Sequence, residues 1–280
     1  MVNVAHEIQE GCIPPGLAAT APGTCRWLVS LDYDGTLRAA EPPYIAPAFW
    51  VLMQRLRPFG VRWGINTGRD LPYLFSELAE CCPVLPDFIC TCERYVYLAD
   101  AAGRLCPMAE HNQACEAINL RLRREFQPTL HGALAEIRRT HPHLQWEIAA
   151  TDPLSVEAAD SETMDALMPL LTPLTTAQLS IQRAGRYMRF GDARFNKGTA
   201  LQLVCHAWGI EASKLFIMGD GQNDIDAFTL FPQAYRSAPA DAHPIVLQWM
   251  HSHGGFISPE NGVIRALSDW FESRVLPQST

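Results

Sequence analysis

The sequence has no run of about 18 consecutive apolar residues, so we expect no membrane-spanning helix. Residues 1–24 lack a basic segment followed by a continuous apolar one, so they carry no sign of a secretory signal, and their prolines and glycines favour a loosely ordered lead-in. The nine cysteines form no paired C-x-x-C, which argues against a zinc site or a disulfide scaffold. Reduced thiols in a cytoplasmic protein are therefore expected.

Positive charge is also in short supply. Lysine and arginine total 22 against 30 acidic residues, which gives a net charge of −8 and argues against a nucleic-acid surface. The chain has 280 residues, 48% hydrophobic and 19% charged, which is typical of a globular protein with one large or two medium domains. We find no internal repeat and no indication of an oligomeric state.

Short apolar runs alternate with helical patterns in the first third of the chain. The runs RWLVSL (26–31), GVRWGIN (60–66) and DFICTC (87–92) have the composition of strands buried on both faces. Helical patterns follow at 49–56 and after Asp70, which can cap a helix containing Leu71, Leu74, Phe75 and Leu78. This order predicts a parallel sheet with crossover helices.

The middle of the chain reads differently. Residues 110–140 are mostly helical with an expected interruption near Pro128, and 143–150 and 154–159 resemble two strands around a turn. A helix is expected at 161–171, and 179–190 resembles a hairpin around Ala184-Gly185. An antiparallel sheet with helices on one face would satisfy this order.

The strand–helix pattern then resumes, with helices expected at 196–208, 242–251 and 268–275 and strands at 214–220 and 234–238. We therefore predict an α/β protein with a Rossmann-like parallel-sheet core, residues 1–98 and 191–280. An α+β domain, residues 99–190, is inserted into it.

Four polar motifs follow apolar strands or begin a helix, and in a parallel sheet such positions converge on one edge. They are Asp32 and Asp34, then Asn66-Thr67-Gly68-Arg69, then Lys197-Gly198, and finally 220–224 with Asp220, Asn223 and Asp224. A hard divalent cation such as Mg²⁺ would neutralise the four carboxylates and suits a site that also holds a phosphate. Lys197 adds a positive charge, Thr67 a hydroxyl, and the backbone around Gly35, Gly68 and Gly221 can approach an anion closely. A carboxylate beside Mg²⁺ can attack phosphorus and form an aspartyl-phosphate while a second carboxylate handles the proton.

The motifs DYDGTL, NTGR, NKGTAL and GDGQND, in this order, resemble those of the haloacid dehalogenase superfamily of phosphohydrolases. The insertion resembles the larger, type-two (C2) cap of the subfamily IIB branch. That branch contains sucrose-phosphate, trehalose-phosphate and mannosylglycerate-phosphate phosphatases and the broad Cof-like phosphatases. The resemblance covers about residues 26–270.

The resemblance implies a role for each matching residue. Asp32 would be the nucleophile, and Asp34 the general acid/base whose backbone carbonyl also binds Mg²⁺. Thr67, with Gly68, would hold a phosphoryl oxygen and Lys197 would stabilise the transferring phosphoryl group. Asp220 would bind the metal, with Asp224 and Asn223 supporting the metal and phosphate site. The implied metal set is therefore Asp32, Asp34, Asp220 and Asp224, and the implied phosphate set Thr67, Gly68, Lys197 and Asn223.

The implied activity is Mg²⁺-dependent hydrolysis of a small phosphorylated metabolite, foremost a sugar phosphate, without nucleic acid or membrane. A broad Cof-like phosphatase, a phosphomutase and a non-catalytic binding module are the alternatives. The third strand departs from the family, because CTCERYVYL stands where many relatives have Asn-Gly. Arg183, Arg186 and Arg189 in the insert could face the substrate or lie on the surface.

Overall fold

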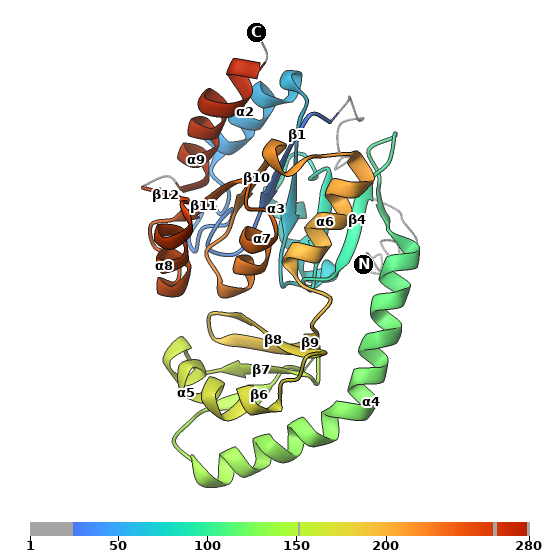
Figure 1. The fold of residues 1–280 in the computed structure, drawn as a ribbon, viewed down its shortest axis with the longest axis vertical. Coiled ribbons are helices and arrows are strands. Elements are labelled where there is room, and N and C mark those ends of the chain that lie inside the picture. Colours follow the sequence, from blue (N-terminus) through green and yellow to red (C-terminus); the bar gives the residue numbers. More distant parts are fainter. Residues whose placement is uncertain (1–24, 151, 260–261, 279–280) are drawn as a thin grey trace.

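The structure is a computed structural model that describes residues 25–150, 152–259 and 262–278. The expected lead-in, residues 1–24, lies outside the described residues. Two sheets organise the rest (Figure 1). No helix in these described ranges is long and apolar enough to cross a lipid bilayer.

The larger sheet has eight strands. In spatial order they are β12 (Phe256–Ser258), β11 (Tyr235–Pro239), β10 (Leu215–Met218), β1 (Trp27–Leu31), β2 (Val61–Asn66), β3 (Phe88–Thr91), β4 (Tyr95–Ala99) and β5 (Leu105–Pro107). The six strands from β12 to β3 pair in parallel, as predicted, whereas β4 and β5 pair antiparallel to their neighbours. Strands β4, β5 and β12 were not expected from the sequence.

Helices cover both faces of this sheet, which explains why its central strands are buried throughout and mostly apolar. One face packs against α2 (Pro47–Leu56), α3 (Leu71–Cys81) and α9 (Gly262–Trp270). The other face packs against α6 (Lys197–Trp208), α7 (Ile225–Leu230) and α8 (Pro244–His253). Helix α9 begins at Gly262, before the expected start at 268. It continues as a π turn, η5 (Phe271–Val275).

Local signals explain several helix starts. The Asp70 side chain accepts a hydrogen bond from the Tyr73 backbone N–H at 2.9 Å, which confirms the expected cap of α3. Asn196 caps α6 in the same way, through the Thr199 N–H at 2.9 Å. This cap fixes Lys197 as the first residue of α6, at the edge of the larger sheet.

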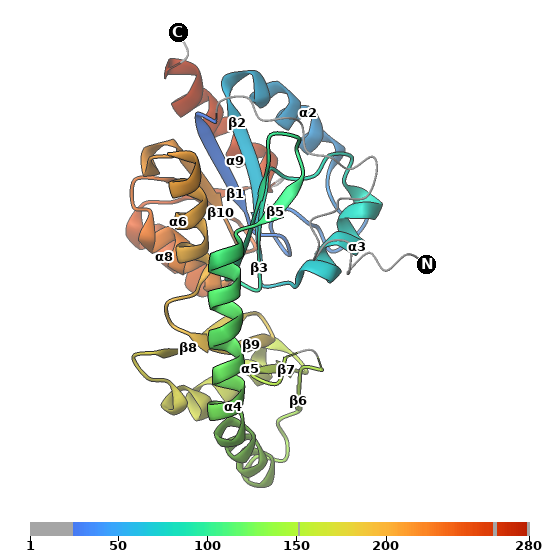
Figure 2. The same ribbon diagram turned by 90° about the vertical axis from the view of Figure 1, so that its right-hand side faces the viewer.

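The smaller sheet has four antiparallel strands in the order β6 (Trp146–Ile148), β7 (Ser155–Ala158), β9 (Tyr187–Asp192) and β8 (Leu179–Ala184). One face buries Val156, Met188 and Phe190 against α5 (Ser161–Leu171) and the second half of α4 (Ala109–Thr140). Figure 2 shows α4 running from the larger sheet to the far end of the smaller one.

The expected interruption of the long helix at Pro128 is wrong. Helix α4 has 32 residues and contains Pro128 in its interior. A proline removes one backbone N–H and crowds the preceding turn, so it bends a helix without having to end it. Figure 1 shows this bend, which carries the second half of α4 under the smaller sheet.

Short turns complete the chain. They are the 3-10 turns η1 (Arg57–Phe59), η2 (Thr172–Leu174), η3 (Ala212–Lys214), η4 (Gln222–Asp224) and η6 (Leu276–Gln278). Of these, η4 begins four residues after the end of β10 and contains two of the expected site residues, Asn223 and Asp224. The eight cysteines among the described residues form no disulfide.

Candidate active site

The structure brings the four polar motifs to the carboxyl-terminal edge of the larger sheet. Asp32 follows β1, Thr67 follows β2, Asp220 follows β10 and Lys197 opens α6. These strands are neighbours in the sheet, so residues nearly 190 positions apart in sequence meet at one place.

Lys197 is the buried cation at the centre of this edge. Its side chain is 1% exposed, and Nζ lies 2.8 Å from Asp32 Oδ1 and 2.7 Å from Asp224 Oδ1. Burial alone would lower the pKa of Lys197, but the carboxylates of Asp224 and Asp32 raise it above its ordinary value, so the ammonium stays charged. The Lys197 backbone carbonyl accepts a hydrogen bond from Asn66 Nδ2 at 2.9 Å, which ties α6 to β2.

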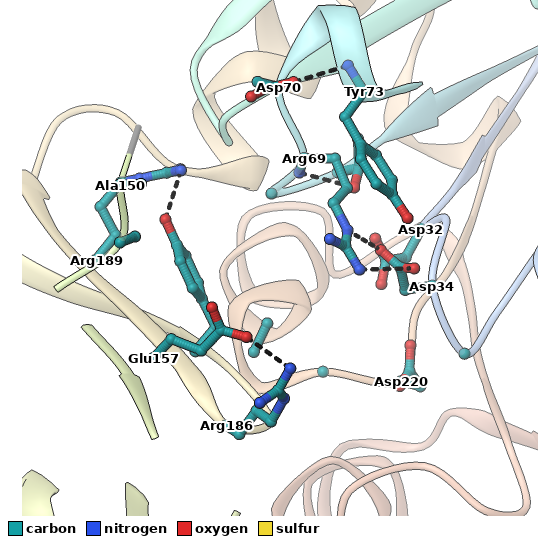
Figure 3. A pocket seen from close by; sticks show the side chains of 18 of the residues that line it. Asp32, Asp34, Arg69, Asp70, Tyr73, Ala150, Glu157, Arg186, Arg189 and Asp220 are labelled. Carbon is teal, nitrogen blue, oxygen red and sulfur yellow. Dashed lines mark hydrogen bonds and ion pairs between the residues drawn. The ribbon is translucent and has the colours of Figure 1, made fainter. Parts of the chain in front are cut away.

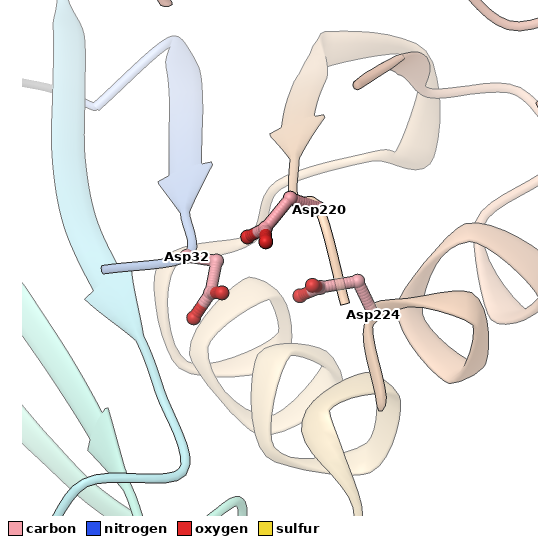
Figure 4. A group of neighbouring side chains, drawn as sticks. All are labelled: Asp32, Asp220 and Asp224. Carbon is pink, nitrogen blue, oxygen red and sulfur yellow. The ribbon is translucent and has the colours of Figure 1, made fainter. Parts of the chain in front are cut away.

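Three carboxylates surround this cation. Oxygen atoms of Asp32, Asp220 and Asp224 all lie within 4.8 Å of one another (Figure 4). Burial and the neighbouring carboxylates raise the pKa of both Asp220 and Asp224. Three carboxylates and one ammonium leave a charge of −2 when all are ionised, which a divalent cation with oxygen ligands would balance.

Two glycines that lie against these carboxylates, Gly35 and Gly219, leave the room that the side chains need. A Cβ on Gly35, whose φ is +73°, would lie 2.4 Å from Asp220 Oδ2. A Cβ on Gly219 would lie 2.1 Å from Asp224 Cγ. Glycine at both positions therefore allows the acidic cluster to form.

Asp34 lies apart from the cluster. Its carboxylate accepts hydrogen bonds from Arg69 Nε at 2.7 Å and Arg69 Nη2 at 3.2 Å, and its side chain is 39% exposed (Figure 3). The Arg69 guanidinium also stacks over Tyr73, 4.4 Å from the ring centroid. The Asp34 carboxylate therefore faces the cavity next to the cluster and is not one of the three grouped carboxylates.

The expected phosphate-binding residues lie beside the cluster. Thr67 is 1% exposed, and its hydroxyl oxygen accepts a hydrogen bond from the Arg69 backbone N–H at 3.1 Å. Asn223 is also buried, and its Oδ1 has no hydrogen-bond partner. Its amide nitrogen is taken, as it donates to Glu93 Oε1 at 2.5 Å.

A cavity of about 760 Å³ opens between this edge and the smaller sheet. The larger sheet contributes Asp32, Asp34, Thr67, Gly68, Arg69 and Asp220 to its wall. Lys197, Asn223 and Asp224 are not part of the wall, and their burial places them behind it. The volume is in the range of small-molecule sites.

The opposite wall is the polar face of the smaller sheet. Side chains of a strand alternate between faces, so Glu157, Tyr187 and Arg189 face the cavity while their neighbours Val156 and Met188 are buried in the apolar core. Arg186 also lines the cavity and pairs with Glu157 at 2.6 Å (Figure 3). This wall is rich in hydrogen-bonding groups.

The three arginines of the insert have different places. Arg186 and Arg189 line the cavity. Arg183 does not line it, because its guanidinium pairs with Asp165 at 2.5 Å and donates to the Ser161 carbonyl. Position in the hairpin alone could not separate them, since the partner acid lies on another element, α5.

Sequence reasoning missed Glu147, Glu157 and Glu93. The alternation of apolar and polar residues in the two strands of the insert was the available signal for Glu147 and Glu157, both of which line the cavity. Glu93 belongs to the CTCERYVYL segment that departs from the family pattern, and its side chain is 4% exposed. Its position near the site depends on the turn between β3 and β4, which was not expected.

Comparison with known proteins agrees with this geometry. Residues 139–267 match the family model of haloacid dehalogenase-like hydrolases. No curated protein sequence matches the chain. Among solved structures, the sucrose-phosphatase from Synechocystis sp. PCC6803, in complex with sucrose and phosphate, is similar with a TM-score of 0.64 and 18% identity, covering 89% of this chain and 97% of that one.

Two further structures have the same fold. A HAD subclass IIB sugar phosphatase, BT4131, has a TM-score of 0.56 and 14% identity, covering 87% of this chain and 98% of that one. TM0651 from Thermotoga maritima has a TM-score of 0.55 and 15% identity, covering 87% and 97%. These solved structures share the fold of this chain, and the family-model match covers the segment that contains Lys197 and Asp220.

Proposed function

We propose that this protein is a Mg²⁺-dependent phosphatase that transfers the phosphoryl group of a sugar phosphate to Asp32 and then to water. The family-model match and the neighbouring structures support a phosphatase. The observation that carries the proposal is the cluster of Asp32, Asp220 and Asp224 around Lys197, open to a cavity through Asp32 and Asp220.

In this proposal Asp32, Asp220 and Asp224 hold the metal ion. The fit rests on their excess negative charge and on the raised pKa of Asp220 and Asp224, which a cation would offset. Bound Mg²⁺ would neutralise charge on the phosphoryl oxygens and on the nucleophile during transfer.

The protein residues would then divide the chemistry. An oxygen of Asp32 attacks phosphorus, the bond from phosphorus to the leaving oxygen breaks, and Asp34 gives that oxygen a proton. Lys197 and the Thr67 hydroxyl stabilise the transferring phosphoryl oxygens. In the second step Asp34 takes a proton from water, which attacks phosphorus and restores Asp32.

In this proposal the Asp34 carboxylate interacts with Arg69 and, during the reaction, also with the leaving oxygen or water. The Arg69 guanidinium holds the carboxylate by two hydrogen bonds at the cavity wall. A leaving oxygen that arrives beside Asp34 would compete with Arg69 for it. Arg69 would therefore hold the Asp34 carboxylate at the cavity wall until the substrate binds.

The smaller sheet, α4 and α5 would serve as the cap, with the core at residues 1–98 and 191–280 and the cap at 99–190. The polar wall of Glu147, Glu157, Arg186 and Tyr187 provides hydrogen-bond donors and acceptors for sugar hydroxyls. The neighbouring sucrose-phosphatase and sugar phosphatase structures favour the same class of substrate. The free thiols agree with a cytoplasmic enzyme.

The test is phosphate release from sucrose 6-phosphate, trehalose 6-phosphate, glucose 6-phosphate and p-nitrophenyl phosphate, with Mg²⁺ or with EDTA. We expect one sugar phosphate to be hydrolysed in a Mg²⁺-dependent manner and Asp32→Asn to abolish turnover. Asp241→Asn, which changes an acid of the core away from the cavity wall, is the matched control and should keep full activity. Turnover that survives Asp32→Asn would refute the assignment, and an isomeric sugar phosphate without free phosphate would indicate a mutase.

A further inference from the structure

The turn between β3 and β4 has an unusual backbone. Arg94 N–H donates to the Thr91 carbonyl at 3.0 Å, and the two residues between them, Cys92 and Glu93, have φ values of +49° and +64°. Two positive φ angles are typical of a type I′ turn, for which Asn-Gly is the favoured pair because other side chains are strained there. Backbone strain at non-glycine residues is often found at functional sites, so the Cys92 and Glu93 side chains are candidates for a functional role.

The backbone of this turn is attached to the loop after β2. Cys92 N–H donates to the Arg69 carbonyl at 2.9 Å, and Glu93 N–H donates to the Thr67 carbonyl at 3.0 Å. The Glu93 carboxylate also packs against Gly68, where an added Cβ would lie 3.3 Å from Oε1. The conformation of Glu93 therefore sets the position of the Thr67 loop.

The Glu93 carboxylate continues this link to a second loop and to the smaller sheet. Oε1 accepts the hydrogen bond from Asn223 Nδ2 at 2.5 Å. Oε2 is buried without a hydrogen-bond partner and lies 3.9 Å from Arg189 Nη1, which is also buried without one. Two unpartnered atoms of opposite charge at this distance would form a hydrogen bond after a small shift of the smaller sheet.

Arg189 reaches Glu93 from the cavity wall. Its Nε donates to Asp152 Oδ2 at 2.9 Å and its Nη2 to the Tyr187 hydroxyl at 2.9 Å, so two of its three nitrogens are held by β9 and by the connection between β6 and β7. The third, Nη1, points to the core residue Glu93. Arg189 therefore belongs to the cavity wall and at the same time contacts the turn that supports the Thr67 and Asn223 loops.

We propose that Glu93 is a positioning residue that couples the cavity-lining Arg189 to the phosphate site through Asn223 and Thr67. The role rests on the proposed phosphatase function. When a substrate draws the smaller sheet closer, Arg189 Nη1 pairs with Glu93 Oε2, and this contact fixes the Asn223 amide and the Thr67 loop for phosphoryl transfer.

A purely structural role for Glu93 is the competing explanation. The surroundings contain three arginines, Arg94, Arg123 and Arg189, around the Asp152 carboxylate. A second carboxylate there would stabilise the fold whatever the reaction. The two roles differ in kinetics, because a structural role predicts no special relation between Glu93 and Arg189 in kcat.

The experiment is a double-mutant cycle on kcat and KM with the preferred sugar phosphate. Glu93→Gln keeps the side-chain shape and removes the charge, and Arg189→Met removes the guanidinium. We expect each single variant to lose roughly 10–100-fold in kcat with a smaller change in KM, and the double variant to be no slower than the worse single one. The matched cycle of Glu93→Gln with Arg186→Met, a cavity arginine with no contact to Glu93, should be multiplicative.

A second variant guards against a folding defect. Cys92→Asn with Glu93→Gly supplies the pair that a type I′ turn prefers, so the turn should be kept while the carboxylate is lost. We expect this variant to be folded by circular dichroism and as slow as Glu93→Gln. Full kcat in the Asn-Gly variant, or multiplicative effects of Glu93→Gln and Arg189→Met, would overturn the proposal. Absence of phosphate release from the unmodified protein would instead refute the phosphatase function itself.

Discussion

Replacing Lys197 by methionine removes a buried cation that pairs with two carboxylates of the acidic cluster. Its ammonium lies 2.8 Å from Asp32 and 2.7 Å from Asp224. With an effective dielectric constant of about 20, each contact is worth about 6 kcal/mol before the cost of desolvation. Breaking a buried ion pair from one side costs about 3–5 kcal/mol after that cost.

The expected shift in melting temperature follows from chain length. An unfolding entropy of about 2.1 cal/mol/K per residue over 280 residues gives about 0.6 kcal/mol/K. A loss of 3–5 kcal/mol therefore lowers Tm by about 5–9 °C in EDTA. Mg²⁺ should restore part of this loss, because it offsets the same carboxylates.

Differential scanning calorimetry with EDTA and with Mg²⁺ measures both effects, and phosphate release from the same samples should fall by about 10²–10³-fold. Lys214→Met is the matched control. Lys214 lies over the Trp27 ring, 4.2 Å from its centroid, away from the cluster, so its loss should change Tm by no more than a degree or two. An unchanged Tm for Lys197→Met in EDTA would refute the assignment of Lys197 as the counter-charge of the cluster.

Three further predictions concern the cluster, the acid/base and the cavity wall. Because the pKa of Asp220 and of Asp224 is raised, the folded, metal-free protein binds more protons than the unfolded one. Tm in EDTA should therefore fall as pH rises from 3.8, the ordinary pKa of an aspartate, into the neutral range. Mg²⁺ should raise Tm more at pH 8 than at pH 6. A Tm in EDTA that is flat or rises over this range would contradict this account. Asp34→Asn should reduce kcat for sugar phosphates by about 10²–10⁴-fold and less for p-nitrophenyl phosphate, whose leaving group needs little protonation; equal losses would argue against Asp34 as the acid. Arg186→Met should raise KM with little change in Tm, whereas Arg183→Met should lower Tm with little change in KM, and the reverse pattern would contradict their placement.

The main elements of the fold were predictable because apolar runs and helix caps are local signals. The strands β1, β2, β3 and β10 are short, mostly apolar segments, since helices cover both faces of the sheet. The cap of α3 by Asp70 was readable for the same reason. The parallel order then placed the four motifs at one edge.

The antiparallel strands and the helix bend depended on distant contacts. β4 and β5 extend the sheet beyond β3, and their sequence has no clear alternation that distinguishes them from a loop. Pro128 favoured a break in α4, but its place within one continuous helix depends on the packing of the second half of α4 against the smaller sheet.

The grouping of the acidic residues was predictable from the motifs, and the other contacts of the candidate site only in part. The motifs identified Asp32, Asp220 and Asp224, which the structure groups together. They did not show that the Asp34 carboxylate pairs with Arg69 or that Glu93 reaches Asn223. The first contact joins side chains 35 positions apart and the second joins side chains 130 positions apart. Such contacts depend on the fold as a whole.

The central claim of this account is covalent transfer of the phosphoryl group to Asp32, and mass spectrometry tests it most directly. The protein would be mixed with its preferred sugar phosphate and Mg²⁺, quenched in acid within the first turnover, and examined by peptide mass spectrometry. The account predicts a phosphoryl group on the peptide that contains Asp32, and none in Asp32→Asn. A phosphoryl group on another residue, or single-turnover phosphate release at the steady-state rate with the Asp32 peptide unmodified at every time point, would contradict it.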